Sequence, residues 1–226
     1  VVVTGTADGE DRRYSETISL GYRAAEIVTG MLVDGSHGYE DLSRLAGAVS
    51  LGAEADMSTT LFAEELPVGG SILIIPGMGS PASDAFGEDV AAFVENGGIL
   101  ILWPGGETCE NENRLLEAIG STLRFGSAAE EDFCTTFNRD QPRCSGLTKN
   151  QFFSHGDGFA VEPGSGVWLV KNGEEQAVLA WEDLGGGVFA AGSAFLEDGA
   201  MPLPQSDWDI PRANESIFRN ILVYQP

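Results

Sequence analysis

Residues 71–106 read SILIIPGMGSPASDAFGEDVAAFVENGGILILWPGG, in which two apolar runs flank one amphipathic segment. The runs at residues 72–75 and 99–103 have the length of strands and are apolar throughout, which is typical of strands buried on both faces. Between them, Ser83 is placed to cap a helix whose apolar residues recur at helical spacing, and Gly97 is placed to end it. The stretch therefore predicts a strand, a helix and a second strand of a parallel sheet.

The same alternation continues outward from this stretch. A short apolar strand is predicted at residues 31–33, and helices follow over residues 39–49 and 107–119. Residues 127–158 are rich in Asp, Asn, Gly and Pro and predict a loop. Three further strands are expected at residues 167–170, 177–181 and 187–192, with a hairpin turn at Gly185–Gly187 and a closing helix over residues 214–224.

Length and composition set the domain organisation. The chain has 226 residues, of which 42% are hydrophobic, enough for one sizeable core. We expect residues 30–226 to form one α/β domain, preceded by residues 1–29 as an N-terminal extension or the end of a β-rich domain. The longest apolar run is of strand length, so the sequence predicts no insertion into a membrane.

Charge is the strongest global signal. The chain carries 35 Asp and Glu against 12 Lys and Arg, a formal net charge of -23. This field repels polyanions, so the composition argues against nucleic-acid binding. Two explanations of the acidity stay open: an organism that lives at high salt, or an exported protein that uses carboxylates for solubility. We expect an extracellular or cell-surface location.

Cysteine and asparagine positions suggest features of an exported protein. Cys134 and Cys144 flank a turn-rich segment and predict a local disulfide, with Cys109 as the unpaired thiol. Asn214, in Asn214-Glu215-Ser216, matches a glycosylation acceptor, although its place at a helix start is equally typical of a helix cap.

Several segments, in their order along the chain, resemble one known family. They are LVDGSHG at residues 32–38, the stretch at residues 71–106, GGGVFAAGSAFLEDG at residues 185–199 and NESIFRNILVY at residues 214–224. The order resembles the class I glutamine amidotransferase-like superfamily, in particular its non-enzymatic branch, which is found in gliding-motility and intraflagellar-transport proteins and in uncharacterised domains of secreted proteins. This resemblance implies a flavodoxin-like three-layer sandwich with a mostly parallel central sheet, plus β-rich C-terminal additions.

The catalytic elements of that superfamily are only partly matched. Its enzymes place a nucleophilic Cys in a G-x-C-x-G turn between a strand and a helix, and here Cys109 follows Gly105-Gly106 but Asn111 replaces the second glycine. The nearby Glu107 and Glu110 would raise the pKa of the thiol, which disfavours a nucleophile. A Cys109–His155 pair remains the catalytic alternative.

Candidate binding residues gather where parallel strands end, since the carboxyl ends of such strands meet at one edge of the sheet. They are Asp34, Ser36, His37, Gly77, Gly79, Ser80, Glu107 and Ser193. Asp34, His37 and Glu107 could together hold a divalent cation, the one cofactor that the sequence suggests. The alternative, which we favour, is that Asp34 and Ser36 satisfy loop backbone groups and cap the following helix.

Together these features predict a non-catalytic binding or scaffolding domain of a larger exported or cell-surface protein, with a protein or glycan partner. The first alternative is an enzyme, either a hydrolase or amidotransferase relative that uses Cys109 with a histidine, or a metal-assisted hydrolase. The second is a carbohydrate-binding module, suggested by Trp103, Trp168, Trp181 and Trp208.

Overall fold

The structure is a computed structural model. It describes residues 5–7, 10–12, 31–33, 58–59, 72–78, 81–148, 150–194, 196 and 213–223. The helix expected over residues 39–49 lies outside these ranges. Within the part of the chain that is described, none of the helices combines the length and the apolar character needed to span a bilayer.

The domain is organised around one mixed sheet. Its strands lie in the spatial order β4 (Ser58–Thr59), β3 (Met31–Val33), β5 (Ile72–Pro76), β6 (Ile99–Trp103), β14 (Gly187–Ala191), β13 (Ala177–Asp183), β12 (Val167–Lys171) and β9 (Thr136–Phe137). The pairings from β4 to β14 are parallel, and those from β14 to β9 are antiparallel. The expectation of a mostly parallel sheet therefore holds for one half of the sheet, and the sheet as a whole is mixed.

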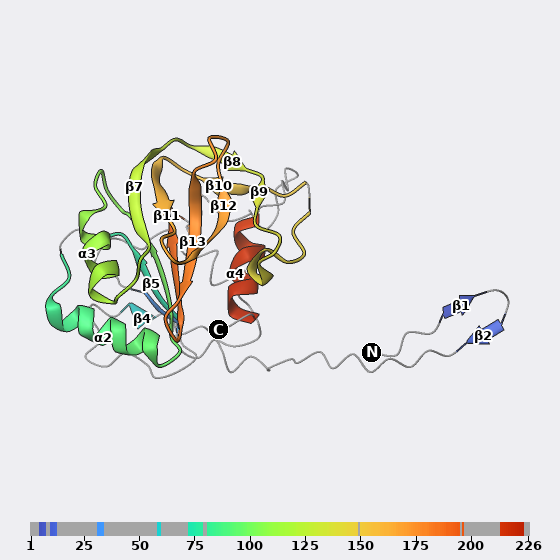
Figure 1. The fold of residues 1–226 in the computed structure, drawn as a ribbon, viewed down its shortest axis with the longest axis horizontal. Helices are drawn as coiled ribbons and strands as arrows, with labels where there is room; N and C mark the ends of the chain where they lie inside the picture. The colour runs from blue at the N-terminus through green and yellow to red at the C-terminus, as the bar shows by residue number, and fades with distance from the viewer. Residues whose placement is uncertain are drawn as a thin grey trace.

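Helices cover both faces of this sheet. In Figure 1, α2 (Asp84–Glu95) and α3 (Glu110–Ala118) lie on one side and α4 (Ala213–Val223) lies on the other. Successive residues of β5 belong to two separate cores. Leu73 and Ile75 pack towards α2 and α3, whereas Ile72 and Ile74 pack towards α4. Because both faces are buried, β5 and β6 are apolar throughout rather than alternating.

The residues that were expected to bound the helices act mostly as predicted. The Ser83 hydroxyl accepts a hydrogen bond from the N–H of Phe86 at 3.2 Å, and Gly97 adopts a positive φ of 93° beyond the end of α2. Helix α3 begins at Glu110, three residues later than predicted, with Cys109 as its N-cap residue. This places the thiol at the start of the helix and not inside it.

The prediction of a loop over residues 127–158 is wrong. This region contains the second half of β7 (Arg124–Ala129), all of β8 (Asp132–Cys134), β9, the 3-10 turn η3 (Pro142–Cys144) and β10 (Phe153–His155), and the first residue of β11 (Gly158–Glu162). Strands β7 and β11 pair with each other, as do β8 and β10. The acidic and turn-forming residues that suggested a loop alternate with buried side chains such as Ala129, Cys134 and Phe153.

The closing helix α4 is tied to β10 through its first two residues. The N–H of Ala213 donates to the carbonyl of Phe152 at 2.7 Å. The amide of Asn214 accepts from the N–H of Ser154 at 2.9 Å and donates to its carbonyl at 3.2 Å. Because Asn214 is fully buried and holds β10 in this way, the folded chain does not present it as a glycan acceptor.

Two short strands of the N-terminal segment are also described. β1 (Gly5–Ala7) and β2 (Glu10–Arg12) pair antiparallel as a separate two-stranded sheet. The division of the chain at residue 30 stays a prediction.

Candidate functional site

The carboxyl ends of β5, β6 and β14 meet at one edge of the sheet, where binding residues were expected. Of these residues, Gly77 follows β5, Glu107 follows β6 and Ser193 follows β14. Glu107 is exposed, whereas Ser193 is buried and its hydroxyl accepts from the N–H of Gly156 at 2.9 Å. Asp34, Ser36, His37, Gly79 and Ser80 lie outside the described residues.

The first two backbone N–H groups of the turn after β5 donate hydrogen bonds within the protein and are therefore not available to a ligand. The N–H of Gly77 donates to the carbonyl of Trp103 at 2.7 Å, and that of Met78 donates to Glu112 Oε1 at 2.7 Å. Gly77 has a positive φ of 84°, and a Cβ built on it would overlap the backbone of Gly105. Glycine is therefore required here for the close approach of two loops, and a role of Gly77 in binding stays a prediction.

The first turn of α3 contains polar residues that the sequence analysis missed. Asn111 Nδ2 donates to the carbonyl of Met78 at 2.9 Å, while the buried Glu112 accepts from the N–H of the same residue. Asn113 accepts from the N–H of Phe125 at 2.8 Å and donates to its carbonyl at 2.9 Å. Three consecutive side chains thus join α3 to the turn after β5 and to β7. No known motif marks this role in the sequence.

Cys109 lies beside this cluster, and the net effect of the described groups around it is to disfavour the thiolate. Its Sγ lies 3.7 Å from the carbonyl of Phe125 and 3.7 Å from Asn113 Nδ2. Burial, followed by the negative charge of Glu112 and to a smaller extent that of Glu110, raises the pKa of the Cys109 thiol. The direction agrees with the prediction, although the main carboxylate is Glu112 and not Glu107.

His155 lies on β10 and is buried near Ser193, which follows β14. Within the described part of the chain it makes no hydrogen bond to Cys109. It is 1% exposed, and its ring nitrogens face the carbonyls of Glu130 and Phe159 without a well-formed hydrogen bond within the described part of the chain. Its Nε2 faces Gly192, where an added Cβ would lie 2.9 Å away. The structure therefore brings His155 and Ser193 into one neighbourhood, but no hydrogen bond joins the imidazole to the thiol.

We expect His155 to make folding sensitive to mild acid. Burial lowers its pKa, and the carbonyls of Glu130 and Phe159 and the carboxylates of Asp132 and Asp157 oppose this only in part. The unfolded chain therefore binds a proton near the ordinary pKa of 6.5 while the folded chain does not, so stability is full above that value and falls below it.

The measurement is the free energy of unfolding in urea against pH, for the parent chain and for His155→Gln. The free energy of unfolding of the parent, relative to that of the variant, is expected to fall by about 1 kcal/mol between pH 7 and about pH 5.5, since only the parent takes up this proton on unfolding. Two parallel pH curves would contradict the prediction. The comparison cancels the titration of the many surface carboxylates, which both chains share.

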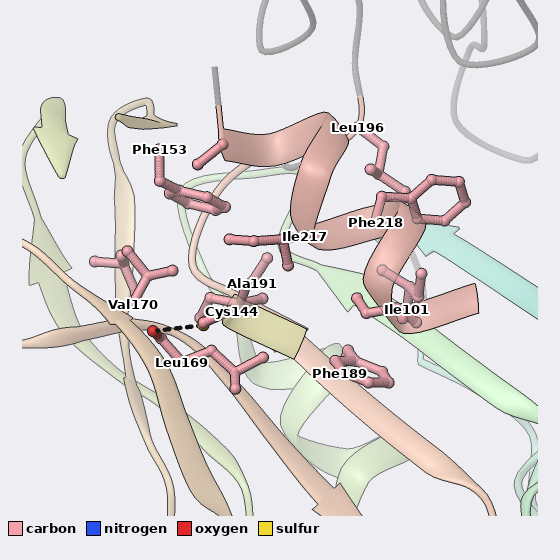
Figure 2. Close-up of a cluster of buried hydrophobic side chains, with 14 of the residues drawn as sticks. Ile101, Cys144, Phe153, Leu169, Val170, Phe189, Ala191, Leu196, Ile217 and Phe218 are labelled. Carbon is pink, nitrogen blue, oxygen red and sulfur yellow. Dashed lines mark hydrogen bonds between the residues drawn. The ribbon is translucent and has the colours of Figure 1, made fainter. Parts of the chain in front are cut away.

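The predicted disulfide is not formed. Cys134 and Cys144 are free thiols buried in the core beneath α4. The sulfur of Cys144 lies 3.4 Å from the carbonyl of Leu169 (Figure 2). Burial raises the pKa of Cys134 to about 12 and that of Cys144 to about 11, so both side chains behave as small apolar groups.

The described residues form no arrangement that supports the hypotheses of a divalent-cation site or a carbohydrate-binding site. Among these residues, no group of three or more His, Cys, Asp or Glu side chains converges to hold a metal ion. Trp103 is buried in the core. Trp181 is half-buried, with the guanidinium of Arg143 3.6 Å from its ring centroid, and Trp168 is covered in part by Lys171. Trp208, Asp34 and His37 lie outside the described ranges.

The elements described above form a mixed α/β fold with helices on both faces of the sheet, and this fold has counterparts among solved structures. The mmIFT52 N-terminal domain is similar with a TM-score of 0.65 at 13% identity, over 84% of this chain and 94% of that one. A ThuA-like protein from Bacteroides uniformis is similar with a TM-score of 0.54 at 12% identity, over 90% and 93% of the two chains. No protein-family model and no curated protein sequence matches the chain. At these identities the likeness establishes the fold alone.

Proposed function

We propose that this chain is a non-catalytic, amidotransferase-like domain that binds or scaffolds partners within a larger exported or cell-surface protein. The observation that carries the proposal is the turn between β6 and α3, where the Cys109 thiol has a raised pKa and, among the described residues, makes its contacts with Phe125 and Asn113 and not with His155. Three further features support the proposal: the fold, the polar cluster of α3 and the charge of the chain.

The strand order supports a flavodoxin-like arrangement of the parallel half of the sheet. Numbered along the chain, β3, β4, β5, β6 and β14 are the first to fifth parallel strands, and they lie in the order 2-1-3-4-5. This is the order of flavodoxin-like folds. The similarity to a ThuA-like protein points the same way, since ThuA has a class I glutamine amidotransferase-like fold. The antiparallel strands β13, β12 and β9 then form the β-rich addition.

The polar groups described at the carboxyl edge argue against catalysis there. In an amidotransferase, a turn such as that after β6 holds an activated cysteine, whereas here Glu112 and Asn113 bind backbone groups around it. The N–H groups of Gly77 and Met78, which could have stabilised a developing charge, are occupied within the protein. The residues at this edge are therefore used for structure.

The proposed setting rests on composition and on the similar folds. A net charge of -23 and few lysines suit an exported or surface-exposed protein, or one from a high-salt organism. The mmIFT52 domain is, by its name, one part of a longer protein, and we take the same modular use as the model for this chain. We place its partners among proteins or glycans of a larger assembly.

The test is the reactivity of Cys109 with iodoacetamide in the native protein near neutral pH. We expect it to alkylate no faster than the thiol of glutathione, because burial and Glu112 disfavour the thiolate. Cys134 and Cys144 are expected to react only after unfolding, since both are buried. Mass spectrometry of each cysteine against time gives the rates.

A Cys109→Ser variant is the control that assigns the native reaction to this residue. Alkylation of Cys109 much faster than that of glutathione, with a midpoint below the ordinary thiol pKa, would indicate an activated nucleophile. That result would favour the alternative, an enzyme that uses Cys109, over the binding domain.

A further inference from the structure

Strand β8 exposes an aromatic side chain at the surface. Among the described residues, Phe133 is the large hydrophobic side chain that is exposed, with 59% of its area accessible. Its ring meets that of Phe152 edge to face, with the centroids 4.8 Å apart and the planes at 74°. Phe152 directly precedes β10, the partner of β8, so the two rings form an aromatic patch on this two-stranded ribbon.

The surroundings of this patch are acidic. Residues 127–138 and 150–158, which contain β8 and β10, include the four acidic residues Glu130, Glu131, Asp132 and Asp157, and the basic residues Arg139 and Lys149 follow or precede these segments. Glu130 and Glu131 are exposed immediately before β8, and the N–H of Glu131 donates to Asp157 Oδ1 at 3.1 Å. The carboxylate of Asp132 instead binds the N–H of Gly173 at 2.7 Å. Two carboxylates, those of Glu130 and Glu131, are thus exposed in the segment that leads into Phe133.

We infer that this acidic aromatic patch, made by Phe133, Phe152, Glu130 and Glu131, docks a basic segment of a partner protein. A guanidinium or ammonium group of the partner lies over the Phe133 ring while the neighbouring carboxylates pair with further positive charges. The inference rests on the proposed function as a binding domain and names the chemistry of its partner. The chain itself makes the same kind of contact, between Arg143 and Trp181.

Charge decides between this occupant and others. A second copy of the chain carries the same net charge of -23 and is repelled, and so are nucleic acids and anionic membranes. A neutral glycan would stack on Phe133 without using Glu130 and Glu131, so its binding would not respond to salt. A basic protein segment uses both the ring and the carboxylates, and its binding weakens as salt screens the charges.

The experiment selects peptides from a random display library on the full 226-residue chain at low salt. We expect enriched peptides to be rich in Arg and Lys. The affinity of one synthetic enriched peptide is expected to fall about tenfold on Phe133→Ala, because an aromatic residue at the centre of a contact contributes most of its energy. A urea unfolding curve of Phe133→Ala that overlays that of the parent chain verifies that the variant is folded.

A charge-matched pair of double variants tests the role of the carboxylates. Glu130→Gln with Glu131→Gln is expected to weaken the peptide about threefold to tenfold and to reduce the salt dependence of binding. Glu88→Gln with Asp89→Asn removes the same charge from an exposed part of α2 and is expected to leave the affinity within about twofold of the parent.

Several results would overturn the inference. They are no enrichment of basic peptides, enriched peptides that bind Phe133→Ala as tightly as the parent, equal effects of the two double variants, or self-association through Phe133. None of these outcomes bears on Cys109, so failure of this inference leaves the non-catalytic proposal standing. Rapid alkylation of Cys109 would reject that proposal without changing the peptide result.

Discussion

Replacing Phe218 by alanine is expected to lower the free energy of unfolding by about 3–5 kcal/mol, the usual cost of deleting a buried aromatic ring. Phe218 lies on α4 and is 1% exposed. Its core cluster includes Ile101 of β6 and Phe189 of β14, so one ring links the closing helix to the centre of the sheet (Figure 2). Urea unfolding followed by tryptophan fluorescence measures the loss.

Two variants separate the loss of packing from other effects. Phe218→Leu keeps most of the apolar volume and is expected to cost about 1–1.5 kcal/mol. Phe133→Ala removes the same ring from an exposed site and is expected to change stability by about 0.5 kcal/mol or less. A loss on Phe218→Ala no larger than that on Phe133→Ala would contradict the packing of α4 over this core.

Replacing Glu182 by alanine is expected to cost about 3–4 kcal/mol, because four donors lose a buried charged acceptor. On β13, this carboxylate accepts from the hydroxyls of Ser121, Thr122 and Ser165 and from the N–H of Thr122, at 2.6–2.7 Å. It joins the turn after α3 to the turn before β12. Glu182→Gln keeps the shape and is expected to cost about half as much.

The pH dependence identifies the charge as the source of this stability. Burial raises the pKa of Glu182, but the hydrogen bonds from Thr122, Ser165 and Ser121 outweigh it and hold the pKa below its usual 4.5. A carboxyl whose pKa is lowered in the folded state contributes fully above the unfolded value and loses that contribution as pH falls through the folded one. The parent's advantage over Glu182→Gln should therefore shrink only below about pH 4.5. Glu88→Gln, an exposed change on α2, is the control and should leave the acid limb unchanged.

The elements that are apolar throughout could be predicted from sequence. The first four residues of β5 and all residues of β6 are directed into a core, and α2 carries both of its boundary signals, so local pattern and fold agree. Strands β7 to β10 could not be predicted because they are short and half-exposed. Their pairing depends on partners distant in sequence, such as Cys134 with Phe153, and composition alone favours a loop there.

The positions of the candidate site residues could be predicted from the sequence, but the hydrogen bonds around them could not. Strand order directs Gly77, Glu107 and Ser193 to the carboxyl edge. Their partners lie far away in sequence: the N–H of Gly77 donates to the carbonyl of Trp103, and the hydroxyl of Ser193 accepts from the N–H of Gly156. The bond between Glu112 and Met78, next to Gly77, likewise follows only from the close packing of two loops. The disulfide prediction was wrong for a related reason, since spacing in sequence does not reveal that the sulfur of Cys144 faces Leu169.

The position of β14 has a consequence for biosynthesis. This strand lies beside β6 in the middle of the sheet, and Ile101 is the partner of Phe189 although most of the chain's second half separates them. As the polypeptide leaves the ribosome, β6 emerges with one edge unpaired and keeps it so until β14 follows. An apolar strand with a free edge readily pairs with neighbouring chains. We therefore expect the nascent chain to be most prone to pair with neighbouring chains in the interval before β14 has been synthesised.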